Sequence, residues 1–185
     1  MRISCSDKQP AGRLARLGIF LCLALGFSYL EFLLPPLLPL PGCKPGFANI
    51  VVTFCACFCG MGEALLVSVV RVLLSSLLFG SITSFLFSLS GALCAYAVLF
   101  LLVRVLGKGI SILGISVSSA AAHNLGQLLA ASFTFGTVFS PNTAVFSYAP
   151  VLLVMGAVTG SVTGLLLSLL FPALRRAGIL PTTGE

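Results

Sequence analysis

The sequence predicts an all-α integral membrane protein, built as a bundle of six transmembrane helices. Only 8% of the 185 residues are charged, 58% are hydrophobic, and the mean hydropathy is +1.17. A soluble domain carries about 25% charged residues. Six apolar runs divide the chain, and most of them are near the roughly 20 residues that cross a bilayer. These runs leave no room for a separate soluble catalytic domain.

The first three runs are bounded by proline and glycine. Run 14–34 is stopped by the proline-rich stretch 35–42, because proline cannot continue a helix. Run 46–60 follows and is short for a full crossing. Only the two residues 61–62 separate it from run 63–79, so these two runs are expected to form an antiparallel helical hairpin.

The last three runs are separated by a basic joint and by a polar loop. Run 85–103 leads into a joint with two basic residues, and run 112–135 carries several polar side chains within its apolar sequence. Run 145–171 is expected to stop at Pro172, just before two arginines.

Basic residues predict the orientation, because they gather on the cytoplasmic side of a membrane. With six spans, one side receives the N-terminal segment, the joint after the fourth run and the C-terminal end, which contain Arg2, Lys8, Arg13, Arg16, Arg104, Lys108, Arg175 and Arg176. The other side receives only Lys44. We therefore expect a cytoplasmic segment 1–12, a membrane domain 13–172 and a cytoplasmic tail 173–185. The net charge of +6 then needs no nucleic acid partner.

A cleaved signal peptide is the alternative interpretation of the N-terminus. Cleavage would leave an odd number of spans and reverse the side of the basic joints, so we expect the first run to remain as a helix.

Small residues recur every four positions on two runs, which allows helix backbones to approach closely. The first stripe is Gly18, Cys22 and Gly26, and the second is Gly156, Gly160 and Gly164, continued by Ser168. Each stripe either packs inside the bundle or docks a second membrane subunit. Spacing alone does not separate these alternatives.

The cysteines predict neither a disulfide framework nor a metal site. There are seven, an odd number, and Cys55 and Cys59 share a helix face that Cys57 does not. No histidine or carboxylate lies in their run, so we expect them to serve as small packing residues.

Polar side chains within or beside the apolar runs are the candidate binding residues, because a charge at mid-bilayer costs about 2.5 to 3.5 kcal/mol even on insertion scales. The candidates are Glu31, Lys44, Asn49, Arg71, His123, Asn124 and Gln127. The last three share one helix face by spacing, for hydrogen bonds between helices or for a polar cavity. No second histidine or nearby carboxylate completes a catalytic or metal site, so we expect ligand contact and no enzyme activity.

Two charged residues lie about two turns apart on run 63–79. Glu63 either favours the helix N-terminus or pairs with Arg71. Arg71 is nearer mid-membrane and must be compensated by Glu63, by Glu31, by backbone carbonyls or by an anionic or carbonyl-rich ligand. A structural ion pair and a ligand-binding role remain equally open.

Motifs for energy coupling and for prenyl-chain chemistry are absent from the sequence. Asp7 is the one aspartate, so the chain has no aspartate-rich magnesium motif. It also lacks the G-x-x-x-x-G-K-[ST] phosphate loop. We therefore expect it neither to hydrolyse ATP nor to elongate prenyl chains, and we expect no bound cofactor.

Four stretches together resemble the bacterial Gx transporter family, also known as heptaprenyl diphosphate synthase component I. They are Ser-Tyr-Leu-Glu at 28–31, Pro-Leu-Pro-Gly-Cys-Lys-Pro-Gly-Phe-Ala-Asn-Ile at 39–50, Glu-Ala-Leu-Leu-Val at 63–67 with Arg71, and Ala-His-Asn-Leu-Gly-Gln at 122–127. The resemblance covers about residues 14–170. The family often has leucine where this sequence has Pro45.

The resemblance implies a six-helix protein of the bacterial cytoplasmic membrane, similar to the S components of energy-coupling factor transporters. Such a subunit captures a vitamin- or cofactor-like solute from outside, and a transmembrane coupling subunit with two ATPases drives its release. By this likeness the loop 35–46 would gate the site, and Gly18, Cys22 and Gly26 would dock on the coupling subunit. Likeness to a component of flavin-based electron transfer implies a flavin or quinone-type ligand.

Three hypotheses follow for the function. The first is a substrate-capturing transporter subunit. The second is a noncatalytic membrane partner of heptaprenyl diphosphate synthase or of a quinone or flavin redox assembly. The third is an autonomous small channel or carrier.

Overall fold

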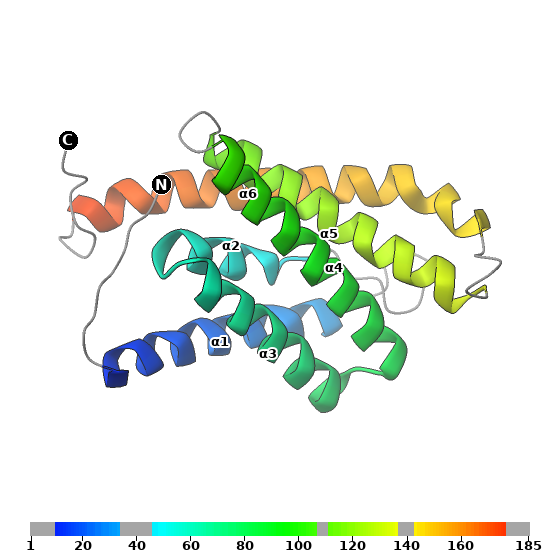
Figure 1. Cartoon of the computed structure of the whole chain (residues 1–185), viewed down its shortest axis with the longest axis horizontal. Helices are drawn as coiled ribbons and strands as arrows, with labels where there is room; N and C mark the ends of the chain where they lie inside the picture. The colour runs from blue at the N-terminus through cyan, green and yellow to red at the C-terminus, as the bar shows by residue number, and fades with distance from the viewer. Residues whose placement is uncertain (1–9, 34–45, 107–110, 137–142, 177–185) are drawn as a thin grey trace.

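The computed structural model describes residues 10–33, 46–106, 111–136 and 143–176, and all their regular structure is helical (Figure 1). The elements are α1 (Pro10–Leu33), α2 (Asn49–Phe58), α3 (Met61–Phe79), α4 (Ile82–Leu101), the π-helical turn η1 (Leu102–Leu106), α5 (Ile112–Thr134), the 3-10 helix η3 (Thr143–Tyr148) and α6 (Ala149–Arg176). The all-α class expected from the sequence is confirmed for this part of the chain.

Four of the described helices are long and apolar enough to cross a membrane, judged by length and composition. These segments are Ala11–Leu33, Met61–Phe79, Ile82–Arg104 and Thr143–Ala173. Helix α2 is shorter, with 10 residues. Helix α5 has 23 residues, but His123, Asn124 and Gln127 lower its hydropathy. The structure therefore establishes a helical membrane-type protein, while six full crossings remain a prediction.

Glycine and serine determine several helix ends. Gly46 and Gly60 precede α2 and α3 with φ angles of 85° and 124°, a region that L side chains rarely adopt. Ser81 caps α4 and Ser111 caps α5, each accepting a hydrogen bond from the backbone N–H three residues later. The Ser81 cap explains why α4 begins at Ile82 rather than at residue 85.

Helix α6 continues to Arg176, so the expectation that Pro172 stops it is wrong. Proline removes one backbone donor and crowds the preceding turn. Long helices of membrane proteins tolerate this loss where neighbouring groups satisfy the freed carbonyl. The two arginines expected after the helix thus form its last turn.

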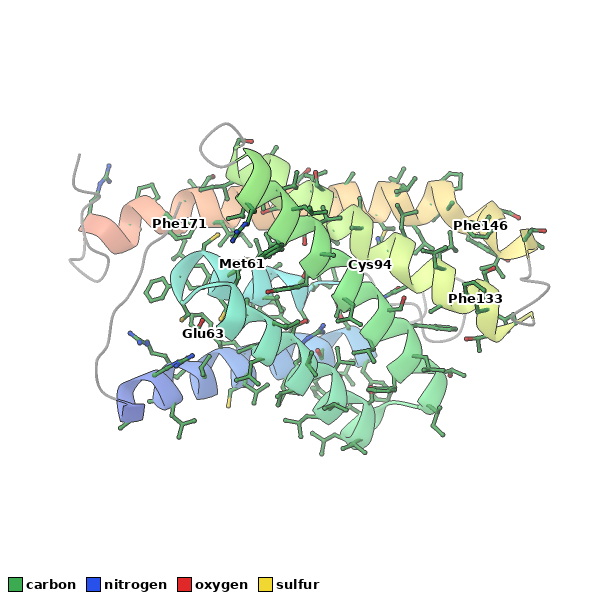
Figure 2. All side chains as sticks on the ribbon, in the orientation of Figure 1. Met61, Glu63, Cys94, Phe133, Phe146 and Phe171 are labelled. Carbon is green, nitrogen blue, oxygen red and sulfur yellow. The ribbon has the colours of Figure 1, made fainter. Side chains whose placement is uncertain are left out.

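Pairwise contacts connect the long helices in series: α1 contacts α3, α3 contacts α4, α4 contacts α5, and α5 contacts α6. Helix α2 lies among them and contacts α1, α3, α5 and α6. Successive helices run back and forth, so the start of α1 and the end of α6 lie at the same end of the molecule (Figure 1). Glu63 and Phe171 mark this end, whereas Phe133 and Phe146 mark the opposite one (Figure 2).

Apolar side chains cover the exterior, and polar ones are buried between the helices. Leu77 and Ile82 are 81% exposed, whereas Arg71 is 5% exposed. This distribution suits a lipid environment, since exposed apolar surface of this extent is unfavourable in water. Cys55 lies buried beside Val51 and Phe58 in an apolar cluster between α1, α2, α3 and α6, so it packs as a small apolar residue.

Candidate functional site

Arg71 is buried on α3, where it faces α1. Its Nη1 atom donates to Ser28 Oγ over 3.2 Å. Its Nε atom has no hydrogen-bond partner among the residues that the structure describes. Glu31 lies on α1 one turn beyond Ser28, is buried and interacts electrostatically with the guanidinium. The buried arginine is therefore oriented by one helix and compensated by a carboxylate of the same helix.

Glu63 does not take part in this arrangement. It lies in the first turn of α3 and accepts a hydrogen bond from Arg13 Nη2 at 2.6 Å. The Arg13 side chain is 61% exposed, so water screens the pair and its contribution to stability is small. Of the two carboxylates considered for Arg71, the structure places Glu31 near it and pairs Glu63 with α1.

His123 and Gln127 form a buried pair on α5. Gln127 Nε2 lies 2.9 Å from His123 Nε2. Because an amide nitrogen donates and does not accept, the imidazole nitrogen must be the acceptor. The imidazole is then neutral and carries its proton on Nδ1. This Nδ1 faces the Gly91 backbone without a hydrogen bond of normal geometry.

Two glycines bound the His123 ring closely. A Cβ atom at Gly46 would lie 3.1 Å from His123 Cδ2, and one at Gly91 would lie 2.9 Å from His123 Cε1. Gly46 precedes α2, and Gly91 lies on α4. The absence of a side chain at these two positions lets the imidazole sit between the segments.

Asn49 connects α2 to the same face of α5. Its Nδ2 atom donates to Ser119 Oγ over 3.2 Å, and Ser119 Oγ donates to Ala95 O on α4 over 3.3 Å. Ser119 precedes His123 by four residues, so it continues the stripe of His123 and Gln127 along α5.

Asn124 points in a different direction from the other polar residues of α5. Its Nδ2 atom donates to Leu152 O over 2.7 Å and so joins α5 to α6. The expectation that Asn124 shares a face with His123 and Gln127 is therefore wrong. A one-residue step rotates the side chain by about 100° around the helix, toward α6.

The structure brings together most of the predicted binding residues between α1, α2, α3 and α5. Arg71 and His123 are close enough to interact electrostatically, which connects the two halves of the arrangement. We call the following set the polar cluster: Ser28, Glu31, Asn49, Arg71, Ser119, His123 and Gln127. All seven are buried. Lys44 and the predicted gating loop, apart from Gly46, lie outside the described residues.

Ser28 and Ser119 were not among the predicted binding residues. Helix spacing could have identified both, since Ser28 lies three residues before Glu31 and Ser119 four residues before His123. Gly46 and Gly91 were not identifiable in this role, because contacts between segments far apart in the sequence define it.

The two small-residue stripes differ in what they contact. A Cβ at Gly156, Gly160 or Gly164 would lie within 3.0 Å of α5 atoms, so this stripe packs inside the chain. Nothing lies within 4 Å of a Cβ at Gly18 or Gly26, and Gly18, Cys22 and Gly26 are exposed. Of the two stripes proposed for docking, the one on α1 is accessible.

Residues 20–170 match the family described as heptaprenyl diphosphate synthase component I. The chain belongs to this family. The match extends over the whole polar cluster and ends within α6, and it confirms the resemblance found in the sequence. No curated protein and no solved structure matches the chain significantly. The family therefore rests on the sequence match, and the likeness to energy-coupling factor S components remains an expectation.

Proposed function

We propose that the protein is the membrane-embedded, substrate-binding subunit of a transporter, which captures a small vitamin- or cofactor-like solute. The polar cluster carries this proposal. Groups from α1, α2, α3 and α5 converge there, far apart in sequence, inside a protein whose exterior is apolar. Because burying charged and polar groups in a membrane protein is unfavourable, we infer that they are retained for a ligand.

A buried donor supports ligand binding over a purely structural role. Arg71 Nε lacks a hydrogen-bond partner within the described structure. A buried donor without a partner costs about 1 to 3 kcal/mol, and helix packing alone would favour its replacement by an apolar group. An acceptor on a bound solute would satisfy Arg71 Nε.

Energy for transport would come from other subunits, since the sequence has no nucleotide-binding motif. We propose a transmembrane coupling subunit with ATPases as the partner, docked on the exposed stripe of α1. The protein itself would not be an enzyme. Both termini would face the cytoplasm, in agreement with the basic residues near the start of α1 and the end of α6. A fluorescent protein fused to the C-terminus would resist external protease if this orientation holds.

Recovery of the tagged protein from native membranes by gentle extraction would test the proposal. Mass spectrometry would record both the proteins and the small molecules that remain bound. We expect a solute and a coupling subunit with ATPases. Arg71→Leu should lose the solute but still insert, whereas Arg104→Leu, at an exposed position of η1 after α4, should retain it. Equal solute retention by both variants would remove Arg71 from the site.

The family description supports a second candidate, a noncatalytic component associated with heptaprenyl diphosphate synthase or with a quinone or flavin redox assembly. In this case the polar cluster would support assembly rather than solute capture. Recovery of a synthase or redox partner, without ATPases or solute, would favour it. Unchanged synthase activity and membrane association in cells that lack this protein would count against it.

A further inference from the structure

The polar cluster contains one cation and one anion. Arg71 and Glu31 are the two buried side chains with a formal charge in the part of the chain that the structure describes, with exposures of 5% and 6%. They interact electrostatically. The other members are hydroxyl and amide groups and an imidazole placed as neutral by Gln127. These seven residues therefore carry no net formal charge, and Lys44 lies outside the described residues.

This balance makes the cluster a poor site for a polyanion. A diphosphate brings more than one negative charge, and sites for such groups use several arginines and lysines, or Mg²⁺ held by carboxylates. Here Arg71 already donates through Nη1 to Ser28, and the Glu31 carboxylate would repel a second anion. Excess charge buried without compensation is strongly unfavourable.

The unsatisfied donor of the cluster instead suits a hydrogen-bond acceptor. Arg71 Nε–H on α3 belongs to a side chain that is more than nine-tenths buried, and it has no hydrogen-bond partner among the described residues. His123 Nδ1 faces the Gly91 backbone and is not free to donate to a solute. One acceptor on a bound solute can satisfy Arg71 Nε.

Building on the proposed function, we propose that the polar cluster binds an electroneutral solute with a hydrogen-bond acceptor, such as a carbonyl oxygen or a ring nitrogen, and excludes phosphorylated solutes. Arg71 Nε donates to this acceptor. Glu31 is a specificity-determining residue, because its charge cancels that of Arg71. A prenyl diphosphate is then not a ligand of this site.

The test uses full-length protein extracted from native membranes into lipid nanodiscs. Bound small molecules are released by heat and compared by mass spectrometry before and after alkaline phosphatase treatment. We expect a compound that is electroneutral and unaffected by phosphatase. Wild type and Arg104→Leu should retain it, and Arg71→Leu should retain about tenfold less, which corresponds to the loss of one hydrogen-bonded contact.

Two other outcomes separate this inference from the proposed function. A phosphorylated compound that depends on Arg71 would overturn the electroneutral ligand class and leave the transporter role standing. No retained compound in wild type and Arg104→Leu would overturn the proposed function, and this inference with it.

A second measurement uses inorganic pyrophosphate as the probe and applies to variants that run as single species in gel filtration. At about 1 mM, pyrophosphate should leave the thermal unfolding midpoint of wild type unchanged, because only binding to the native state raises it. Glu31→Gln leaves Arg71 without a compensating charge, so pyrophosphate should bind this variant and raise its thermal unfolding midpoint. An equal rise in wild type would contradict the role of Glu31.

Discussion

Ser28 fixes the position of Arg71, the one buried cation of the polar cluster. The hydroxyl accepts from Nη1 and so holds the planar guanidinium against α1, where Glu31 is one turn away. Arginine has five donors in a fixed fork, so a single hydrogen bond determines where the remaining donors point. The unpartnered Nε is directed by this contact.

Replacement of Ser28 with alanine should weaken solute retention by at least about tenfold, because one hydrogen bond to a charged group contributes roughly 1.5 to 3 kcal/mol. Ser75→Ala is the matched control. Ser75 is also buried and lies one turn beyond Arg71, but its hydroxyl bonds to Val72 O of its own helix. Solute retained per mole of purified protein would be measured. Equal losses in both variants would show that Ser28 does not position Arg71.

The sequence predicts which polar residues are buried better than it predicts what they contact. Charged and amide side chains in apolar runs identified Glu31, Asn49 and Arg71 because their burial in lipid is unfavourable without a partner. Their actual partners include serines, which are too common in apolar helices to stand out. Asn124 was assigned to the wrong face, since its direction depends on where α6 lies.

Close packing at the element scale depends on which face a small residue occupies. Gly160 lies where α6 crosses α5, and a Cβ there would be 2.5 Å from Val117 Cα and 2.9 Å from Ser116 O. These are backbone atoms, which cannot move without separating the helices. Gly18 has the same sequence spacing to its neighbours but faces outward.

Gly160→Ala should lower the free energy of unfolding by about 1 to 3 kcal/mol, the usual cost of overpacking. Gly18→Ala, with nothing within 4 Å of its Cβ, should change it little or raise it slightly, since alanine favours helix. Unfolding in detergent micelles, followed by circular dichroism, would measure both. A loss of equal size at Gly18 would mean that α1 packs differently from the arrangement in Figure 1.

Helix positions were predictable from apolar runs, whereas helix ends were less so. The run at 112–135 corresponds closely to α5, because Ser111 supplies a cap that the sequence displays. Pro172 was misleading, since a long helix tolerates a proline that would end a shorter one. The shortness of α2 was visible in the sequence, but its position among four other helices follows only from tertiary packing.

At the scale of the whole molecule, polar groups are inside and apolar groups outside. The small-residue stripe on α1 differs from the rest of the exterior. Most of the outward surface consists of large apolar side chains, which suit lipid. The stripe of Gly18, Cys22 and Gly26 instead presents a flat strip of α1. In lipid, such a strip allows another helix to approach closely, and the resulting van der Waals contact drives association.

Bulky residues on this strip should therefore prevent docking without affecting the fold. We expect the double variant Gly18→Leu and Gly26→Leu to insert, to keep its unfolding midpoint and to retain solute, but to lose the coupling subunit during co-purification. Ala97→Leu places a leucine on an exposed position of α4 and should retain the partner. Quantitative mass spectrometry of the purified complexes would compare them. If the double variant retains its partner, docking uses another face, and the α1 strip contacts only lipid.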